Sequence, residues 1–181
     1  MVRGDSGNEA RALVTIAAAA GATPGRARYA VLSTFPHGLD PMPTPAQAKA
    51  SLRRMERITG RKFRYVPPTP ASYRISQDSD VWIAATEALA VGAGRSDVRA
   101  AAIKALSTLA GVIQTPTKVD GTRALEVDFP DEGAREIIWL NATTGVPIRE
   151  QDGGNSATAF TVQRVTSAHL PSQISPRARL R

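Results

Sequence analysis

The spacing of apolar residues changes near Gly111, and this change constrains the fold more than any other feature of the sequence. From Ser96 to Val112 the chain reads SDVRAAAIKALSTLAGV, with apolar residues on one face of a helix. Ser96 suits the N-cap, and Gly111 suits the left-handed residue after a helix. Beyond Val112, apolar and polar residues alternate, which predicts strands. The free face of the helix offers alanines rather than long polar side chains, so we interpret it as a packing helix.

Downstream of this helix, the sequence predicts an antiparallel meander of about five strands. Asp120-Gly121 is a strong signal for a two-residue hairpin. Turn-forming residues near 130–133, 141–145 and 152–155 separate the later runs. The predicted strands are 112–119, 122–129, 135–140, 146–150 and 157–165.

The N-terminal half predicts helices and one further strand. Thr44-Pro45-Ala46-Gln47 fits a capping box that starts a helix. Alternation over 28–34 predicts a strand that joins the sheet. The predicted helices are 9–20, 45–59, 80–91 and 96–110, separated in part by proline-rich connectors at 35–45 and 66–72. The expected buried face of the helix over 45–59 holds Ala48, Leu52, Met55 and either Ile58 or Thr59.

These patterns predict an α+β fold with N-terminal helices packed on an antiparallel sheet of about five to six strands, because helices and strands are segregated along the chain. Neither half can bury its own apolar surface alone. We therefore expect a single domain over 1–170, followed by a disordered basic tail over 171–181.

The net charge of +7 is unevenly distributed along the 181 residues. Residues 1–75 carry 12 basic and 4 acidic side chains, and the tail adds Arg177, Arg179 and Arg181. This basic character favours polyanions or an anionic membrane surface, or it reflects only a solvated face and a tail. No apolar run is long enough to span a membrane. The run 12–22 fits a packed helix better than the centre of a signal peptide.

No motif in the sequence indicates an enzyme. The absence of cysteine excludes disulfides and thiolate chemistry, and there is no phosphate-binding glycine loop or nucleophile elbow. His37 and His169 lack partners at metal-ligand spacing. The carboxylates of Asp128, Asp131, Glu132 and Glu136 surround a tight turn, where such residues are common. We therefore expect no catalysis, metal or cofactor.

A run of basic residues over 49–64 is the best candidate for binding nucleic acid. Arginine and lysine neutralise phosphates, and Phe63 or Tyr65 could stack on a base. The run lacks any known nucleic-acid reading motif. Its candidate polyanion-binding residues are Lys49, Arg53, Arg54, Arg57, Arg61, Lys62 and Arg64.

Four segments carry a family resemblance. SDVRAAAIKALSTLAGV, followed by hairpins and REIIWLNATTGVPIRE, resembles a group of uncharacterised actinobacterial proteins. EARALVTIAAAAGATPGRARY and PTPAQAKASL are similar to that group as well, so the likeness spans about 9–165. Proteins of the group usually have a membrane anchor and an extracytoplasmic domain, and are often encoded beside extracytoplasmic-function sigma factors. The turn in WLNATTGVPIR also resembles the strand–turn–strand of lipoprotein-carrier-like (LolA-like) half-barrels.

The resemblance implies a curved, half-barrel sheet that wraps around helices and binds an apolar ligand at the cell envelope. Leu125, Val127, Phe129 and Trp139 would then line the concave face, although the same residues could form an ordinary core. Two features depart from the group: the anchor helix is absent, and TFPHGLDPMP replaces a long run of strands. We therefore expect a reduced sheet and a shallow pocket, if one is retained.

Two functional hypotheses follow. The first is a non-catalytic envelope-type sensing or carrier domain that binds an apolar ligand, such as a lipid, or a protein partner. The alternative is a basic cytoplasmic protein that binds nucleic acid through the helix over 49–64. The resemblance favours an extracytoplasmic or membrane-associated location, whereas the lack of a clear signal or anchor favours the cytoplasm. An unpaired edge of the reduced sheet would also permit a homodimer.

Overall fold

A computed structural model describes residues 6–131, 134–151 and 157–160. Within these residues the chain forms helices followed by one antiparallel sheet that is not closed, so the predicted α+β class is confirmed. The helices are α1 (Ser6–Ala17), α2 (Pro24–Leu32), α3 (Pro45–Thr59), α4 (Pro70–Val91) and α5 (Ser96–Leu106). The strands are β1 (Ile113–Val119), β2 (Thr122–Asp131), β3 (Ala134–Asn141), β4 (Pro147–Gln151) and β5 (Ala157–Ala159).

The sheet is a meander in which each strand pairs with the next along the chain. Val119 pairs with Thr122 across a tight hairpin, and both turn residues, Asp120 and Gly121, have positive φ (49° and 79°). This is the backbone that a two-residue hairpin requires, and it confirms the sequence-based turn. Of the last predicted strand, 157–159 is confirmed, whereas 161–165 and the tail 171–181 lie outside the described residues.

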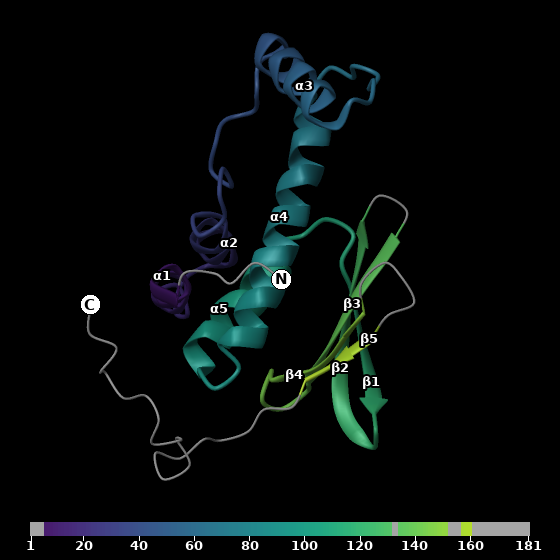
Figure 1. The fold of residues 1–181 in the computed structure, drawn as a ribbon. Helices are drawn as coiled ribbons and strands as arrows, with labels where there is room; N and C mark the ends of the chain where they lie inside the picture. The colour runs from purple at the N-terminus through teal and green to yellow at the C-terminus, as the bar shows by residue number, and fades with distance from the viewer. Residues whose placement is uncertain (1–5, 132–133, 152–156, 161–181) are drawn as a thin grey trace, which may run out of the picture.

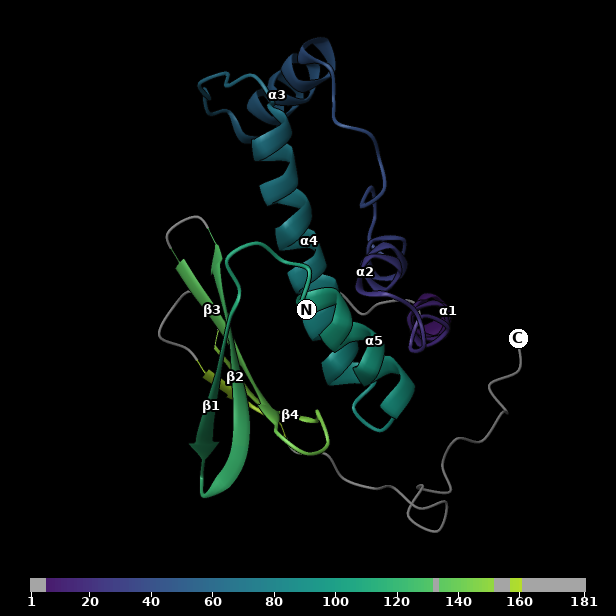
Figure 2. The same ribbon diagram turned by 180° about the vertical axis from the view of Figure 1, so that it is seen from behind.

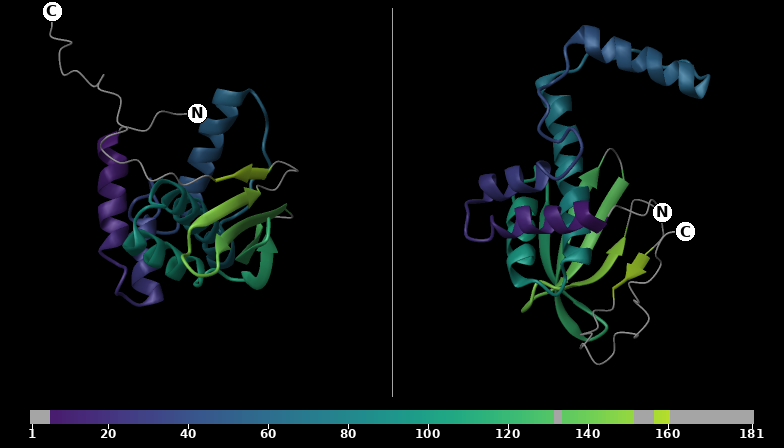
Figure 3. Two further views of the ribbon diagram at one scale, coloured as in Figure 1. Left: turned by 90° about the horizontal axis from the view of Figure 1, so that it is seen from below. Right: turned by 60° about the vertical axis from the view of Figure 1, so that its left-hand side comes forward.

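The molecule has three layers, with α4 and α5 in the middle (Figures 1 and 2). The sheet covers one side of this pair, and α1 and α2 cover the other, as the two views of Figure 3 also show. The rings of Trp82 on α4 and Phe129 on β2 are stacked, with centroids 5.3 Å apart. One apolar cluster extends from Ile16 on α1 to Leu140 on β3, so the helices and the sheet share a core.

The predicted strand over 28–34 is wrong, because most of this segment belongs to α2. Pro24 occupies the first turn of the helix, where its missing N–H needs no partner. Ala27, Ala30 and Val31 are buried at the three- and four-residue spacing of a helix, and Tyr29 is exposed. An apolar run this short does not distinguish a strand from a helix. The sheet accordingly has five strands within the described residues rather than six.

Helix α4 begins ten residues before the predicted start at Asp80, within a segment expected to be a connector. Thr69 caps it: its hydroxyl accepts a hydrogen bond from the Ser72 amide, and the Ser72 side chain accepts one from the Thr69 amide. Pro70 follows the cap, as Pro45 follows Thr44 in α3. Pro70, one of the prolines in the predicted connector 66–72, is therefore the first residue of a helix. In α5, by contrast, Ser96 is the first helical residue and not the N-cap.

Candidate polyanion-binding arm

Residues 45–69 form an arm that projects from the N-terminal end of α4, away from the sheet (Figure 1). The arm consists of α3 and a return segment, 60–69. The return segment passes the start of α3 and leads into α4. Gly60 ends α3 with a left-handed φ of 67°. The Tyr65 hydroxyl then donates a hydrogen bond of 3.3 Å to the carbonyl of Pro45, which holds the return segment against the helix.

The capping box that starts α3 is formed as predicted, but the predicted buried face is not. No residue of α3 is buried; Met55 is 50% exposed and Ile58 is 69% exposed, while Ala48 and Leu52 are half-buried. The expectation was wrong because an apolar face becomes buried only if another element covers it. Here the return segment offers only partial cover.

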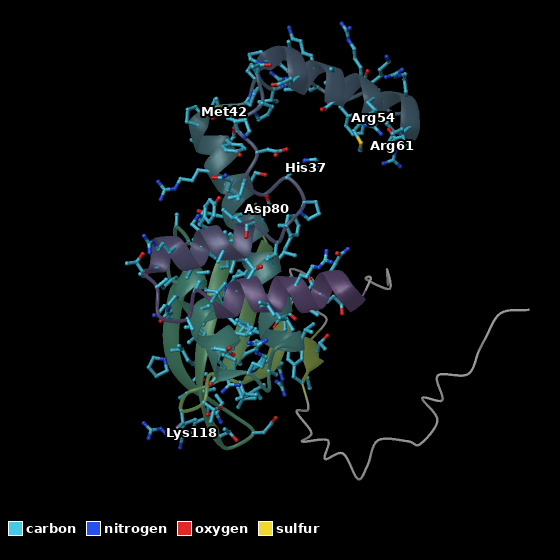
Figure 4. The ribbon with its side chains drawn as sticks, turned by 90° about the vertical axis from the view of Figure 1, so that its left-hand side faces the viewer. His37, Met42, Arg54, Arg61, Asp80 and Lys118 are labelled. Carbon is cyan, nitrogen blue, oxygen red and sulfur yellow. The ribbon has the colours of Figure 1, made fainter. Side chains whose placement is uncertain are left out.

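Most of the net charge of the protein is on this arm. Residues 45–69 contain seven basic side chains and one acidic side chain, Glu56, which gives a net charge of +6 out of +7 for the chain. All seven basic residues are exposed. Figure 4 shows Arg54 and Arg61 on the arm, far from Lys118 at the opposite end of the molecule. The structure therefore brings together all the predicted polyanion-binding residues on one projecting element.

Few of these cations are neutralised by neighbouring side chains. Lys62 lies 3.7 Å from Glu56, and the Lys49 ammonium lies 5.0 Å from the centre of the Tyr65 ring. Within the described ranges, no ion pair involves any of the arginines of the arm, which are Arg53, Arg54, Arg57, Arg61 and Arg64. The guanidinium groups are thus available for an external anion.

The helix places part of the charge in a row. Lys49, Arg53 and Arg57 are four residues apart, so they lie near one another on one face with a rise of about 6 Å between them. Arginine binds phosphate oxygens with two parallel hydrogen bonds. Phe63, on the return segment, is 42% exposed and offers an aromatic face. This arrangement can bind several phosphate groups at once and can stack on a base.

The residues predicted to line a concave face do not all lie together. Val127 and Phe129 are 2% and 3% exposed within the core, and Leu125 packs against it. Trp139 pairs with Glu126 on the opposite face of the sheet, and its indole N–H donates a hydrogen bond of 2.9 Å to the Glu126 carboxylate. Placing Trp139 beside the other three was wrong because β3 is apolar on both faces, which hides its orientation.

A groove remains where α5 meets the sheet, with a volume of about 600 Å³. Its apolar wall is formed by Leu125, Leu140, Ile103 and Pro116. Arg99 and Arg123 also line it, and Arg99 donates a hydrogen bond of 2.9 Å to the carbonyl of Thr144. Among the four predicted ligand-binding residues, Leu125 alone borders this groove.

His37 and Asp128, two of the remaining titratable candidates, each lie beside a charged partner in the described part of the chain. His37 is exposed, and its Nδ1 lies 2.7 Å from Asp40. His169 and Glu132 lie outside the described residues. Asp128 pairs with Arg135, and this carboxylate raises the pKa of the Arg135 guanidinium chiefly through their hydrogen bond. In the part of the chain that is described, no three His, Asp or Glu side chains are placed to hold a metal ion.

No protein-family model, curated protein or solved structure matches this chain. The resemblance to the actinobacterial group and to lipoprotein-carrier-like half-barrels therefore stays a prediction. No helix within the described ranges is both long and apolar enough to cross a membrane.

Proposed function

We propose that this protein is a non-catalytic binding protein that contacts the sugar–phosphate backbone of nucleic acids through its basic arm. The observation that carries this proposal is the concentration of charge: the arm holds +6 of the net +7 on an element with no buried helical residue. A helix that contributes nothing to the core is free to make contacts elsewhere. Its composition then reflects the partner rather than the fold.

Three features favour a nucleic acid over a membrane surface as this partner. A helix that lies in a bilayer interface needs a continuous apolar face opposite its cations. In α3 the return segment partly covers that face, and Leu52 is half-buried there. Five of the seven cations are arginine, which suits bidentate contacts with phosphate. Phe63 supplies a stacking surface, which a lipid headgroup does not use.

The mode of binding follows from the geometry of the arm. Lys49, Arg53 and Arg57 would contact successive phosphates and release condensed counterions. Phosphate contacts position a protein but carry no sequence information, so we expect little sequence preference. Binding should weaken steeply with salt, with a slope that reports the number of phosphates contacted.

Fluorescence anisotropy with labelled single-stranded and duplex oligonucleotides tests this function. Arg53→Ala/Arg57→Ala should weaken binding and reduce the slope of log K against log salt by about 1.4 to 1.8, depending on the strandedness of the ligand. Arg26→Ala/Lys118→Ala is a matched control, because it removes two exposed cations outside the arm. Absence of binding, equal loss in the control, or stronger binding to vesicles of anionic phospholipid would refute the proposal.

A second candidate function is the binding of an apolar ligand with an anionic head. The groove between α5 and the sheet favours it, because apolar walls including Leu125 and Leu140 adjoin two guanidinium groups. Native mass spectrometry of the purified protein should then detect a bound lipid. Ala100→Phe, which adds a ring at an exposed position in the groove, should remove that lipid. Unchanged lipid binding in this variant would exclude the groove as the site.

A protein partner and a homodimer remain predictions. β1 forms one edge of the sheet, and Ile113 on it is 59% exposed. However, Pro116 lies in the middle of this strand and has no N–H to donate to a neighbouring strand. Pairing through β1 would therefore be interrupted, and sedimentation that shows only monomer would exclude such a dimer.

A further inference from the structure

A second binding site, independent of the arm, is indicated by a hollow between α1 and α4. The hollow has a volume of about 190 Å³, and the segment after α2 closes one side of it. Its apolar lining includes Leu13, Ile16, Phe35, Ala84 and Ala88. Ile16, Ala84 and Ala88 are all less than 8% exposed, so the floor of the hollow belongs to the rigid core. We name it the α1–α4 hollow.

The charge at this hollow is opposite to that of the protein as a whole. Glu9 on α1 and Glu87 on α4 both line it and are both exposed. Neither carboxylate has an ion-pair partner within the described residues, and none of those that line the hollow is basic. These two carboxylates give the rim of the apolar recess a negative formal charge in a chain whose net charge is +7.

We propose that the α1–α4 hollow binds a small organic cation: a compact apolar body that carries one ammonium group. The apolar body would lie against Ile16 and Ala88, and the ammonium group would lie between the carboxylates of Glu9 and Glu87. The size of the body is limited by the volume. An apolar cavity of about 150 Å³ accommodates benzene. A hollow of about 190 Å³ therefore suits one ring with a short side chain.

Charge complementarity distinguishes this cation from other occupants. A neutral molecule of the same shape would gain only the apolar contacts, and an anion would be repelled by both carboxylates. The affinity should be modest, because a ligand of this size makes few contacts and the carboxylates are open to water.

The experiment is an NMR titration of the full chain at pH 7 with three probes of similar shape: benzylamine, benzyl alcohol and benzoate. Benzylamine should shift the amide signals of Ile16, Ala84 and Ala88 and should bind several-fold more tightly than benzyl alcohol. Benzoate should not bind. Equal binding of the amine and the alcohol, or shifts confined to other regions, would overturn the proposal.

Variants complete the test. Glu9→Gln/Glu87→Gln should weaken benzylamine binding several-fold while preserving the shape of the hollow. Ala12→Phe should block it by filling the recess from the half-buried face of α1. Asp120→Asn is the matched control, because it removes a carboxylate at the distant β1–β2 turn and should bind like the wild type. Wild-type affinity in either hollow variant, or a similar loss in the control, would overturn the proposal.

Discussion

Arg28 on α2 and Asp78 on α4 form an ion pair of 2.6 Å between the two helical layers, where their side chains are 18% and 6% exposed. The other carboxylate oxygen of Asp78 accepts a hydrogen bond of 3.3 Å from the Ala110 amide. The Arg28 guanidinium also donates one of 3.4 Å to the Thr108 hydroxyl. This pair thus links α2, α4 and the segment after α5, and no motif in the sequence indicated it.

Asp78→Ala should lower the free energy of unfolding by about 3 to 5 kcal/mol, because it leaves a buried guanidinium without its partner. Arg28→Met should lower the free energy of unfolding by a similar amount, because it leaves the buried carboxylate of Asp78 without its partner. The double variant Arg28→Met/Asp78→Asn should lose less than the sum of the two single changes, since neither buried charge then remains. Urea unfolding followed by circular dichroism measures the stability of all three variants.

Asp97→Ala, at the exposed pair with Arg95, is the control and should change stability little. Strict additivity would contradict the coupling.

The carboxylate of Asp80, two residues before Trp82 on α4, is expected to lower stability at neutral pH. Partial burial raises the pKa of its carboxyl group in the folded protein. In the pH range between the unfolded and folded pKa values, the folded state binds more protons, so stability falls as pH rises through this range. Asp80→Asn should therefore raise the free energy of unfolding at pH 7 only slightly, because water screens a carboxyl group that is only partly buried. The gain should disappear at pH values below the unfolded pKa. A loss of stability at pH 7 would contradict this expectation.

The two faces of the sheet should respond differently to substitution. Phe129→Ala should lower the free energy of unfolding by about 3 to 5 kcal/mol, because Phe129 is 3% exposed and stacks on Trp82. Trp139→Phe should lower it much less, since Trp139 is on the outer face and is only half-buried. Chemical denaturation of each variant measures this difference. A comparable loss in both would place Trp139 in the shared core.

The alternation of apolar and polar residues, together with the turn signals between the runs, was sufficient to predict the sheet. Alternation over 122–129 and the Asp120-Gly121 turn are local signals, and each is realised in the structure. Helix α5 was equally predictable, because Val98, Ala102 and Ala105 mark its buried face at helical spacing. In these segments, local preference and tertiary packing favour the same backbone.

The predictions were wrong where the outcome depends on which element covers a face. The apolar residues at 28–34 fit a strand or a helix, and the neighbouring helices decide between them. The apolar face of α3 is typical of a buried helix, yet only the return segment 60–69 lies against it. The basic residues of the arm were evident in the sequence. Their projection from the body was not, although Thr-Pro capping signals at 44–45 and 69–70 mark where the arm begins and ends.

The arm should be dispensable for the stability of the body. Replacing 45–68 with a Gly/Ser linker of equal length keeps Thr69, the cap of α4, and removes no buried side chain. The free energy of unfolding should therefore change by no more than about 1 kcal/mol, because the flexible linker adds only a modest closure entropy. Both tryptophans lie outside the replaced segment, so their fluorescence during urea unfolding reports on the body alone. Helical circular dichroism should decrease by the contribution of α3. A loss of more than about 2 kcal/mol would mean that the arm packs on the body, and a basic element that supports the core would be a weaker candidate for binding polyanions.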